Sequence, residues 1–461
     1  MMGAFPQEKL MLNNKILILG VFVFFLTFNL NSVEDTKMEN NISKIKEMAL
    51  GENDAMNKLA ELCLGIGHRL SGSKGLEEAV LWGKKSFEDE GINAFLHEVM
   101  VPHWERNEES LFLVQPYLKK MSFLSFGGSV ATLNSEGEVE PIIADVIVLN
   151  SVEELSSKVE GKIVLFNIPM PENSLTGYGA VSRFRYSGAI EAAKHGAVGA
   201  LLRSITTNSL NTPHTGGMGY SNEYKKIPYG AVTIEDAMAM AKMQEMGIPI
   251  RIQMKLSAKT YPDALSHNVI GEIKGSKYPD EVVIVSGHLD AWDVGHGAFD
   301  DGAGVVHAME TLSIIKRLGL TPKRTIRAIL WTNEENGARG GSEYSKEYGK
   351  NTFAAIESDL GAEKPTGWVS EGNEEQKKML ENILKGTGLD LIGNGSGVDI
   401  GPMREHGVLL IGLRNISVRY FDYHHAPSDT LDKINEEEFE EGLAHIATLT
   451  WALANIETFE N

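Results

Sequence analysis

Cysteine is nearly absent from this sequence, since Cys63 is the only one in 461 residues. A single cysteine cannot form an internal disulfide, so the hydrophobic core must hold the fold together. Cys63 lies in the apolar stretch LAELCLGIG, and we interpret it as a core residue and not as a nucleophile. Positive charge is also scarce: 43 Lys and Arg stand against 63 Asp and Glu, a formal net charge of −20. This excess of acid argues against nucleic-acid binding, which requires a basic surface.

The apolar run Ile16–Leu30 follows Lys9 and Lys15 and is too short for a typical membrane span. We therefore predict a cleaved signal peptide over residues 1–32. The protein would then be exported (secreted, periplasmic or lysosomal, depending on the host), and its mature chain would have no membrane span. An uncleaved membrane anchor is the alternative interpretation of the same run.

The length of the chain predicts two or three domains, and 42% hydrophobic residues are enough for well-formed cores. Helical spacing of apolar residues predicts helices over Ser43–Leu64 and Gly75–Asp89. From about Glu109 to Ile252 short β-rich pieces alternate with Gly, Asn and Pro, with one helix around Gly188–His195. We expect a main domain formed by residues 33–112 and 258–461, interrupted by an inserted domain over residues 113–257.

The last part of the chain alternates between strand and helix patterns. Val282–Val285 and Ile326–Trp331 are apolar runs typical of strands buried on both faces, and helical spacing connects them over Val305–Ile315. Asn435 and Glu438 form a candidate capping box for a final helix. The pattern predicts an α/β fold, in which ligand sites lie at the carboxyl ends of the strands.

Two segments contain most of the candidate catalytic chemistry, SGHLDAWDVGHGAFDDGAG (Ser286–Gly304) and WTNEENG (Trp331–Gly337). They bring one histidine and several carboxylates close to predicted strand ends: His288, Asp290, Asp300, Glu334 and Glu335. Imidazole with several carboxylates is a ligand set for a hydrolytic metal centre of the zinc type. Two metals that share a bridging carboxylate can activate a water and bind both oxygens of a tetrahedral intermediate. We therefore interpret the chain as a two-metal hydrolase.

Spacing indicates how some of these residues divide their roles. Glu334 and Glu335 are adjacent and cannot face the same way, so one can bind metal while the other acts as a general base. His288 and Asp290 lie two apart and point the same way if the chain is extended, which would let Asp290 orient an imidazole. A loop histidine with a capping aspartate is the alternative for this pair.

Asp300 and Asp301 directly precede a helix that is expected to begin near Gly302. A helix N-terminus favours carboxylates without any metal, so capping is the alternative to a bridging role for Asp300.

Asp359 ends the strand expected from Phe353, where a ligand can reach the cleft. The loop YFDYHHAPSDT (Tyr420–Thr430) adds two neighbouring histidines and Asp429, which is a candidate for orienting one of them. The weaker candidates for metal binding are His296 and His307.

Together these segments resemble the dizinc exopeptidase family, which includes aminopeptidases and glutamate carboxypeptidases. The resemblance covers roughly Ser43 to the C-terminus and also rests on RLSGSKGLE (Arg69–Glu77), PHTG (Pro213–Gly216), AKTYPD (Ala258–Asp263) and GSKYP (Gly275–Pro279). It implies a mixed central sheet flanked by helices, with the insertion as a protease-associated domain that shapes access to the site. It further implies two Zn²⁺ per chain, a non-proline cis peptide between Asp300 and Asp301, and a homodimer.

The same resemblance assigns the ligands. One zinc would be held by His288 and Asp359 and the other by Glu335 and His425. Asp300 would bridge the two ions, Glu334 would be the general base, and Asp290 would be the carboxylate behind a ligand. The family often has a tyrosine before its last histidine ligand, but this chain has His424 there, so His424, with Tyr423 or Tyr420 as substitutes, is a candidate for stabilising the oxyanion.

We therefore expect an exported exopeptidase that cleaves short peptides, in particular dipeptides with free ends. The enzymatic alternative is an aminopeptidase with the same metals. Recognition of a free carboxylate would call for a cation such as Arg404, Arg414 or Arg419. The alternative from another class is a binding protein that kept this fold and lost catalysis, which would be expected to lack bound metal.

Overall fold

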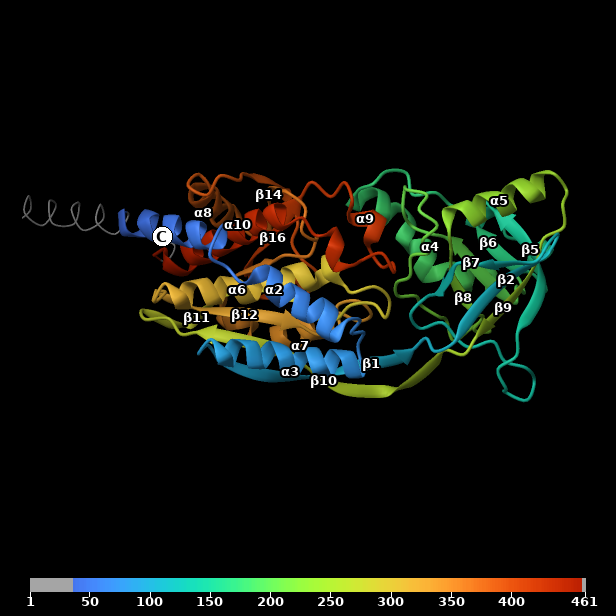
Figure 1. Ribbon diagram of the computed structural model, residues 1–461, viewed down its shortest axis with the longest axis horizontal. Helices are drawn as coiled ribbons and strands as arrows, with labels where there is room; N and C mark the ends of the chain where they lie inside the picture. The colour runs from blue at the N-terminus through green and yellow to red at the C-terminus, as the bar shows by residue number, and fades with distance from the viewer. Residues whose placement is uncertain (1–35, 458–461) are drawn as a thin grey trace, which may run out of the picture.

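The computed structural model describes residues 36–457, in which two eight-stranded sheets lie at opposite ends of an elongated molecule (Figure 1). The two outer parts of the chain, blue and yellow to red in Figure 1, form the first sheet, and the green middle part forms the second. The signal peptide expected over residues 1–32 lies outside the described residues. Within residues 36–457, no helix has both the length and the apolar character that a membrane crossing requires.

The first sheet is mixed, and its four central strands run parallel to one another. In spatial order its strands are β1 (Asn93–Glu105), β10 (Lys259–Ile273), β12 (Arg324–Trp331), β11 (Tyr278–His288), β13 (Thr352–Glu357), β16 (Leu409–Asn415), β14 (Pro365–Glu371) and β15 (Leu391–Asn394). Helices pack on both faces of this sheet, which confirms the predicted α/β class with a mixed central sheet.

Alternate residues of β11 explain why its sequence reads as a continuous apolar run. Val283 and Val285 join the core beneath the helices of one face, while Val282 and Ile284 join the core on the other face. The first face is covered by residues 36–49, α2 (Ala55–Ala60), α3 (Lys74–Asp89), α6 (Ala303–Arg317), α8 (Glu374–Leu384) and α10 (Glu436–Asn455). The second face is covered by α7 (Arg339–Tyr348).

The second sheet contains four parallel strands with antiparallel strands on both sides. In spatial order its strands are β3 (Lys119–Met121), β2 (Glu109–Gln115), β9 (Arg251–Leu256), β5 (Ile142–Leu149), β6 (Ile163–Phe166), β7 (Gly199–Arg203), β8 (Tyr229–Val232) and β4 (Phe123–Ser125). Its two faces pack against α4 (Leu175–Lys194) and α5 (Ile234–Glu245). We call residues 109–256 the second-sheet region.

This region is richer in helix than its sequence pattern predicts. Helix α4 begins at Leu175 rather than near Gly188, because the Ser174 side chain accepts a hydrogen bond from the Gly177 N–H and caps an earlier turn. The boundary expected at residue 113 falls inside β2, which starts at Glu109.

Two further expectations on helices differ in detail. The helix expected over Ser43–Leu64 is interrupted after residue 49, where the Asn53 side chain accepts from the Ala55 N–H and starts α2 anew. Asn435 does cap α10 by accepting from the Glu438 N–H. The Glu438 carboxylate binds Arg419 instead of completing the capping box.

Short helical turns connect these elements. They are η1 (Glu61–Ile66), η2 (Val152–Glu154), η3 (Ser157–Val159), η4 (Ala298–Gly302), η5 (Gly349–Asn351), η6 (Gly401–His406) and η7 (Leu431–Lys433), with the short helix α9 (Tyr420–Tyr423). Cys63 lies in η1 within the main core, and burial raises the pKa of its thiol to about 12, which confirms its interpretation as a core residue.

The two sheet regions share one hydrophobic cluster. Tyr420 and Phe421 of α9 pack with Val181 of α4, and the ring of Phe421 stacks on that of Tyr178 with 5.1 Å between centroids. Figure 1 accordingly shows α9 beside α4. The contact places the loop after α9 between the two regions.

Candidate metal centre

Three neighbouring parallel strands end at the same edge of the first sheet. Strand β11 ends at His288, level with Trp331 at the end of β12, and β13 ends at Glu357 on the other side of β11. The polar residues that directly follow β12 and β13 are therefore brought to the end of β11. They include Glu334, Glu335 and Asp359.

One group of facing ligand atoms surrounds the imidazole of His288. Its Nε2 lies 3.1 Å from Asp300 Oδ1 and 3.4 Å from Asp359 Oδ1. A second group surrounds His425, whose Nε2 lies 2.9 Å from Glu335 Oε2 and 3.3 Å from Asp300 Oδ2. Asp300 thus faces both histidines, one with each carboxylate oxygen.

This donor set fits divalent metal ions. His288, Asp300 and Glu335 offer ligand atoms that all lie within 4.8 Å of one another, as do Asp300, His424 and His425. The buried Asp300 Oδ2 makes no hydrogen bond within the described residues, as expected of a ligand atom. Imidazole nitrogens and carboxylate oxygens without thiolate are ligands that zinc accepts.

Two buried carboxylates hold the segment around Asp300. Asp429 Oδ1 accepts the N–H groups of Ala298 and Phe299, and its Oδ2 accepts that of Asp300 at 3.2 Å. Asp301 Oδ2 accepts the His288 N–H. The peptide between Asp300 and Asp301 is cis, as the resemblance implies. Asp429 therefore supports Asp300, whereas the sequence suggested that it orients a histidine.

Asp290 also acts differently from the expectation. His288 Nδ1 donates to the backbone carbonyl of Asp290 at 2.9 Å, whereas the carboxylate Oδ1 is 3.9 Å away, beyond hydrogen-bond distance. The carboxylate instead accepts the N–H groups of Glu334 and Glu335. Strand β11 ends at His288, so Asp290 lies beyond the strand geometry that the spacing assumed.

Burial and neighbouring charges shift the pKa values of Glu334 and His288. Burial raises the pKa of Glu334 well above its ordinary value; His288 opposes the rise and Asp359 adds to it. Burial lowers the pKa of His288, but hydrogen bonds to Asp300 and Asp359 outweigh it and raise the pKa overall. These effects show that Glu334 shares the buried charges of the centre.

The candidates for stabilising an oxyanion lie on the side of the centre that contains His425. His424 Nε2 is 3.6 Å from Asp300 Oδ2, and its ring stacks on that of His425 with 3.6 Å between centroids. Tyr423 packs against Phe299 with 5.4 Å between ring centroids, and Tyr420 is buried beside His424.

The weaker histidine candidates take other roles. His307 is buried in α6 and bonds to the Ser358 hydroxyl and the Phe439 carbonyl, and burial lowers its pKa to about 4. His296 accepts from the Leu431 N–H in a loop. Neither side chain contacts the cluster.

Comparison with known proteins identifies the family of this chain. Residues 268–450 match the model of peptidase family M28. Carboxypeptidase Q from Bos taurus is 40% identical over 417 residues, covering 88% of this chain and 86% of that protein. Carboxypeptidase Q from Xenopus laevis is 42% identical over 391 residues, covering 82% and 81%. The chain belongs to peptidase family M28. It is a zinc metallopeptidase.

Solved structures share the fold of this M28 peptidase. A peptidase M28 precursor from Shewanella amazonensis superposes with a TM-score of 0.87 at 30% identity, covering 92% of this chain and 98% of that one. A zinc aminopeptidase from Bacillus subtilis has a TM-score of 0.66 at 19% identity, covering 88% and 98%, and shares the fold.

Several residues of this M28 peptidase that contact the centre are not predictable from local sequence patterns. Arg69 is buried and donates to the carbonyls of Leu289, His296 and Gly297, which holds together the two ends of the segment between β11 and η4. Its motif, RLSGSKGLE, contributes to the family resemblance without indicating this role. An arginine among small residues offers no local sign of burial.

The second-sheet region also reaches the centre, although its sequence lacks a concentration of catalytic residue types. Arg185 Nη1 lies 3.5 Å from His425 Nδ1 and donates to the Tyr178 hydroxyl at 2.6 Å. His214, in the PHTG motif, bonds through Nδ1 to the His424 carbonyl at 2.7 Å. These contacts join residues about two hundred positions apart, which no local pattern predicts.

Of the three arginines considered for carboxylate recognition, two already have acidic partners. Arg404 pairs with Glu371, and Arg419 pairs with Glu363 and Glu438. Arg414 makes no ion pair with any residue in the range 36–457. Burial lowers the Arg414 pKa, and the charges of Asp359 and Glu357 oppose this.

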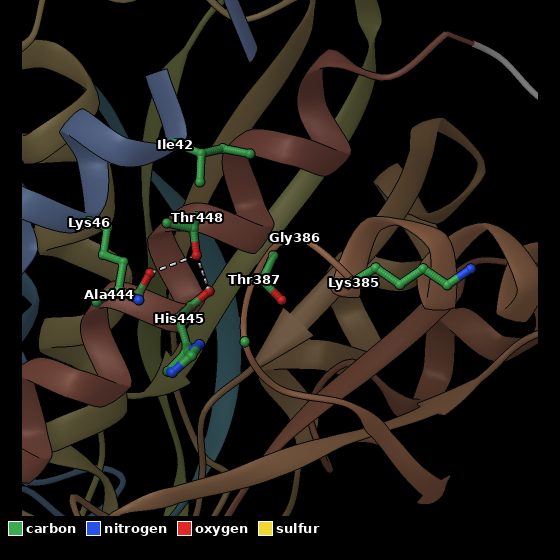
Figure 2. Close-up of a pocket in the computed structure, with 9 residues that line it drawn as sticks. Ile42, Lys46, Lys385, Gly386, Thr387, Ala444, His445 and Thr448 are labelled. Atoms are coloured by element: carbon green, nitrogen blue, oxygen red, sulfur yellow. Dashed lines mark hydrogen bonds between the residues drawn. The ribbon is translucent and has the colours of Figure 1, made fainter. Parts of the chain in front are cut away.

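A cavity of about 300 Å³ lies away from the candidate metal centre, between residues 36–49, the end of α8 and α10. In Figure 2 the Thr448 hydroxyl bonds to the carbonyls of Ala444 and His445, and Lys385 extends away from His445. The cavity lining has no carboxylate, and burial lowers the pKa of His445 to about 4. Within residues 36–457, each group of side chains that could hold a metal ion contains His288 or Asp300.

Proposed function

We propose that this M28 peptidase is an exopeptidase that binds two zinc ions and cleaves short peptides, in particular dipeptides with free ends. The observation that carries the proposal is Asp300, which faces His288 with one oxygen and His425 with the other. In this proposal His288 and Asp359 would hold one ion, and Glu335 and His425 would hold the other. Asp300 would be shared between the two sites.

Zinc bound there would lower the pKa of a water and polarise the scissile carbonyl. Glu334 is the general base in this proposal. It takes a proton from the attacking water and passes it to the leaving amine. Burial raises the pKa of Glu334 above its ordinary value, and a general base in this role needs a pKa raised by its surroundings.

His424 is proposed to stabilise the oxyanion, and Tyr423 is the less favoured candidate. The His424 Nε2 faces the centre 3.6 Å from Asp300, whereas the Tyr423 ring packs on Phe299. Asp290 supports catalysis through the backbone, because its carboxylate accepts the N–H groups of both Glu334 and Glu335.

We propose Arg414 as the group that binds the free carboxylate of the substrate. It lies two residues after Gly412 of β16, which pairs with Glu357 at the end of β13, and Asp359 follows that strand end. A half-buried guanidinium that has no ion pair within residues 36–457 and is influenced by the charge of Asp359 is suited to a carboxylate, which it can bind with two parallel hydrogen bonds.

The remaining proposals concern organisation and location. Residues 113–257 would form a protease-associated domain that shapes access, between the two parts of a peptidase domain over residues 33–112 and 258–461. The apolar run near the N-terminus supports export with removal of residues 1–32. A homodimer is proposed from the family resemblance.

A panel of dipeptides tests the proposed substrate with zinc-loaded protein. The panel contains one sequence in three forms: both ends free, the amine blocked, and the carboxylate blocked. Cleavage that requires a free carboxylate supports the dipeptidase proposal. Efficient cleavage of the carboxyl-blocked form would make the protein an aminopeptidase, and no cleavage by zinc-loaded protein would favour a binding protein.

A further inference from the structure

We propose that the loop Pro213–Gly217 of the second-sheet region positions the metal ligand His425. We call this segment the PHTG loop. The inference rests on the proposed function, because it takes His425 to be a zinc ligand. It makes the second-sheet region part of the metal centre rather than only a cover over it.

The PHTG loop binds the backbone of both neighbouring histidines. His214 Nδ1 donates to the His424 carbonyl at 2.7 Å, and the Thr215 N–H donates to the His425 carbonyl at 2.8 Å. The His425 backbone has a φ of 59°, in the left-handed region that residues other than glycine rarely adopt. Such a conformation persists where its surroundings hold it. These two hydrogen bonds add to those within the histidine loop, from the His424 N–H to the Tyr420 carbonyl and from the Ala426 N–H to the Tyr423 carbonyl.

The PHTG loop also sets the orientation of the imidazole. His425 Nδ1 lies 3.3 Å from the Thr215 carbonyl oxygen, which can only accept a hydrogen bond. Arg185 Nη1 lies 3.5 Å from Nδ1 but donates to the Tyr178 hydroxyl and to the Thr215 carbonyl. The proton therefore belongs on Nδ1, and the Nε2 lone pair is directed to Glu335 and Asp300. A carbonyl behind a ligand imidazole selects the tautomer and the ring orientation that metal binding needs.

The loop is itself held from two sides. The Thr215 hydroxyl donates to the Ser125 carbonyl at 2.9 Å and accepts from Arg106 Nη2 at 3.3 Å. Arg106 is paired with Asp293 at 2.8 Å, in the segment between β11 and η4. Arg185 donates to the Gly217 carbonyl at 3.1 Å. The position of His425 thus depends on how the two sheet regions are joined.

The experiment compares zinc binding by four variants of the full chain. His214→Ala removes the donor to the His424 carbonyl, and His214→Asn keeps an N–H donor near the Nδ1 position. His195→Ala is the matched control, because His195 is an exposed histidine of the same region. His425→Ala removes the proposed ligand itself. Zinc content is measured by mass spectrometry, and zinc affinity by competition with a chromogenic chelator.

We expect the His425→Ala protein to lose one of two zinc ions. The His214→Ala protein should bind one of its two ions 10- to 100-fold more weakly, while the other ion keeps its affinity. His214→Asn should restore affinity to within about threefold, as expected for a positioning hydrogen bond. His195→Ala should match the parent protein.

The outcomes separate the inference from the proposed function. If His425→Ala loses one ion and His214→Ala binds both normally, the inference is wrong and the proposed function stands. If His425→Ala keeps both ions, the ligand assignment itself fails. Equal weakening of both ions in His214→Ala would indicate general loosening and also overturn the inference.

If His214→Ala does not fold, Thr215→Val tests the same loop with a side chain of the same shape. It removes the hydroxyl contacts to Ser125 and Arg106 and should weaken one ion about three- to tenfold. Parent-like affinity in Thr215→Val would then overturn the inference.

Discussion

The two halves of the centre are built in different ways. His288 ends a central strand, and Asp359 follows the neighbouring parallel strand, so the register of the first sheet brings them together. His425 lies in a loop with a left-handed backbone, and Thr215 of the second-sheet region contacts its carbonyl oxygen and its Nδ1. A ligand at a strand end is placed by its own sheet, whereas a ligand in a loop needs partners from elsewhere.

Asp300 links the two halves, and its support is also shared. Asp429 comes from the loop that follows His425, yet it holds the backbone of Asp300. Asp301 holds the backbone of His288. Movement of the loop would therefore affect the bridging carboxylate as well as the loop ligand.

The largest effect is expected from a change at Glu334, the proposed general base that lies beside both halves of the centre. Glu334→Gln keeps the size of the side chain but cannot accept a proton. We expect kcat for a free dipeptide to fall by about 10² to 10⁴, while zinc content and thermal stability stay at parent values. Steady-state kinetics and metal analysis check this, and turnover close to that of the parent would rule out Glu334 as the base.

A second variant tests whether the half around His288 and Asp359 also recognises the substrate. Arg414→Met removes the guanidinium and keeps a long side chain. We expect kcat/KM for free dipeptides to fall about 10- to 100-fold, mainly through KM, with little change for carboxyl-blocked substrates. Arg404→Met is the control, because Arg404 is exposed and paired with Glu371. Equal losses on free and blocked substrates would contradict carboxylate recognition by Arg414.

A third variant tests the link between the halves. Asp429→Asn keeps the shape but loses charge-assisted acceptance of the Ala298, Phe299 and Asp300 N–H groups. We expect the free energy of unfolding to fall by about 1–3 kcal/mol. Denaturant unfolding of zinc-loaded protein measures it. Asp432→Asn, an exposed change in the same segment, should stay within about 0.5 kcal/mol. A similar small change for Asp429→Asn would show that the link is weak.

The smallest effect is expected from a change at Glu457, which lies outside the metal centre. Lys277, Lys323 and Tyr278 lower the pKa of Glu457 to about 2. A lowered acid pKa stabilises the fold above the unfolded value of about 4.3, and that contribution is lost as the pH falls from there towards 2. Because the cluster is exposed, it contributes less than about 1 kcal/mol.

Glu457→Gln should therefore lower the melting temperature slightly at pH 7, and the difference from the parent should shrink below pH 4. Acid effects on the metal centre occur in both proteins and cancel in this difference. A difference that grows on acidification would contradict the assigned shift.

Much of the centre could be predicted from the sequence because its residues come directly after apolar strands. The apolar run of β11 and β12 indicated strands buried on both faces, and parallel neighbours bring the residues at their carboxyl ends to one edge. His288, Glu334 and Glu335 were predicted in this way. The roles of Asp290 and Asp429 were not, because the partners of each carboxylate depend on turns that bring distant backbone N–H groups to it.

The sequence by itself determined the α/β class, the donor types of the centre and their approximate placement, because periodicity and strand ends are local properties. The tertiary structure alone decided which atoms meet. His424 and His425 look alike in the sequence. In the structure His425 Nε2 lies 2.9 Å from Glu335 Oε2, whereas the His424 ring stacks on that of His425. The PHTG loop reaches them from 210 positions away, and only packing of the two sheet regions makes that contact.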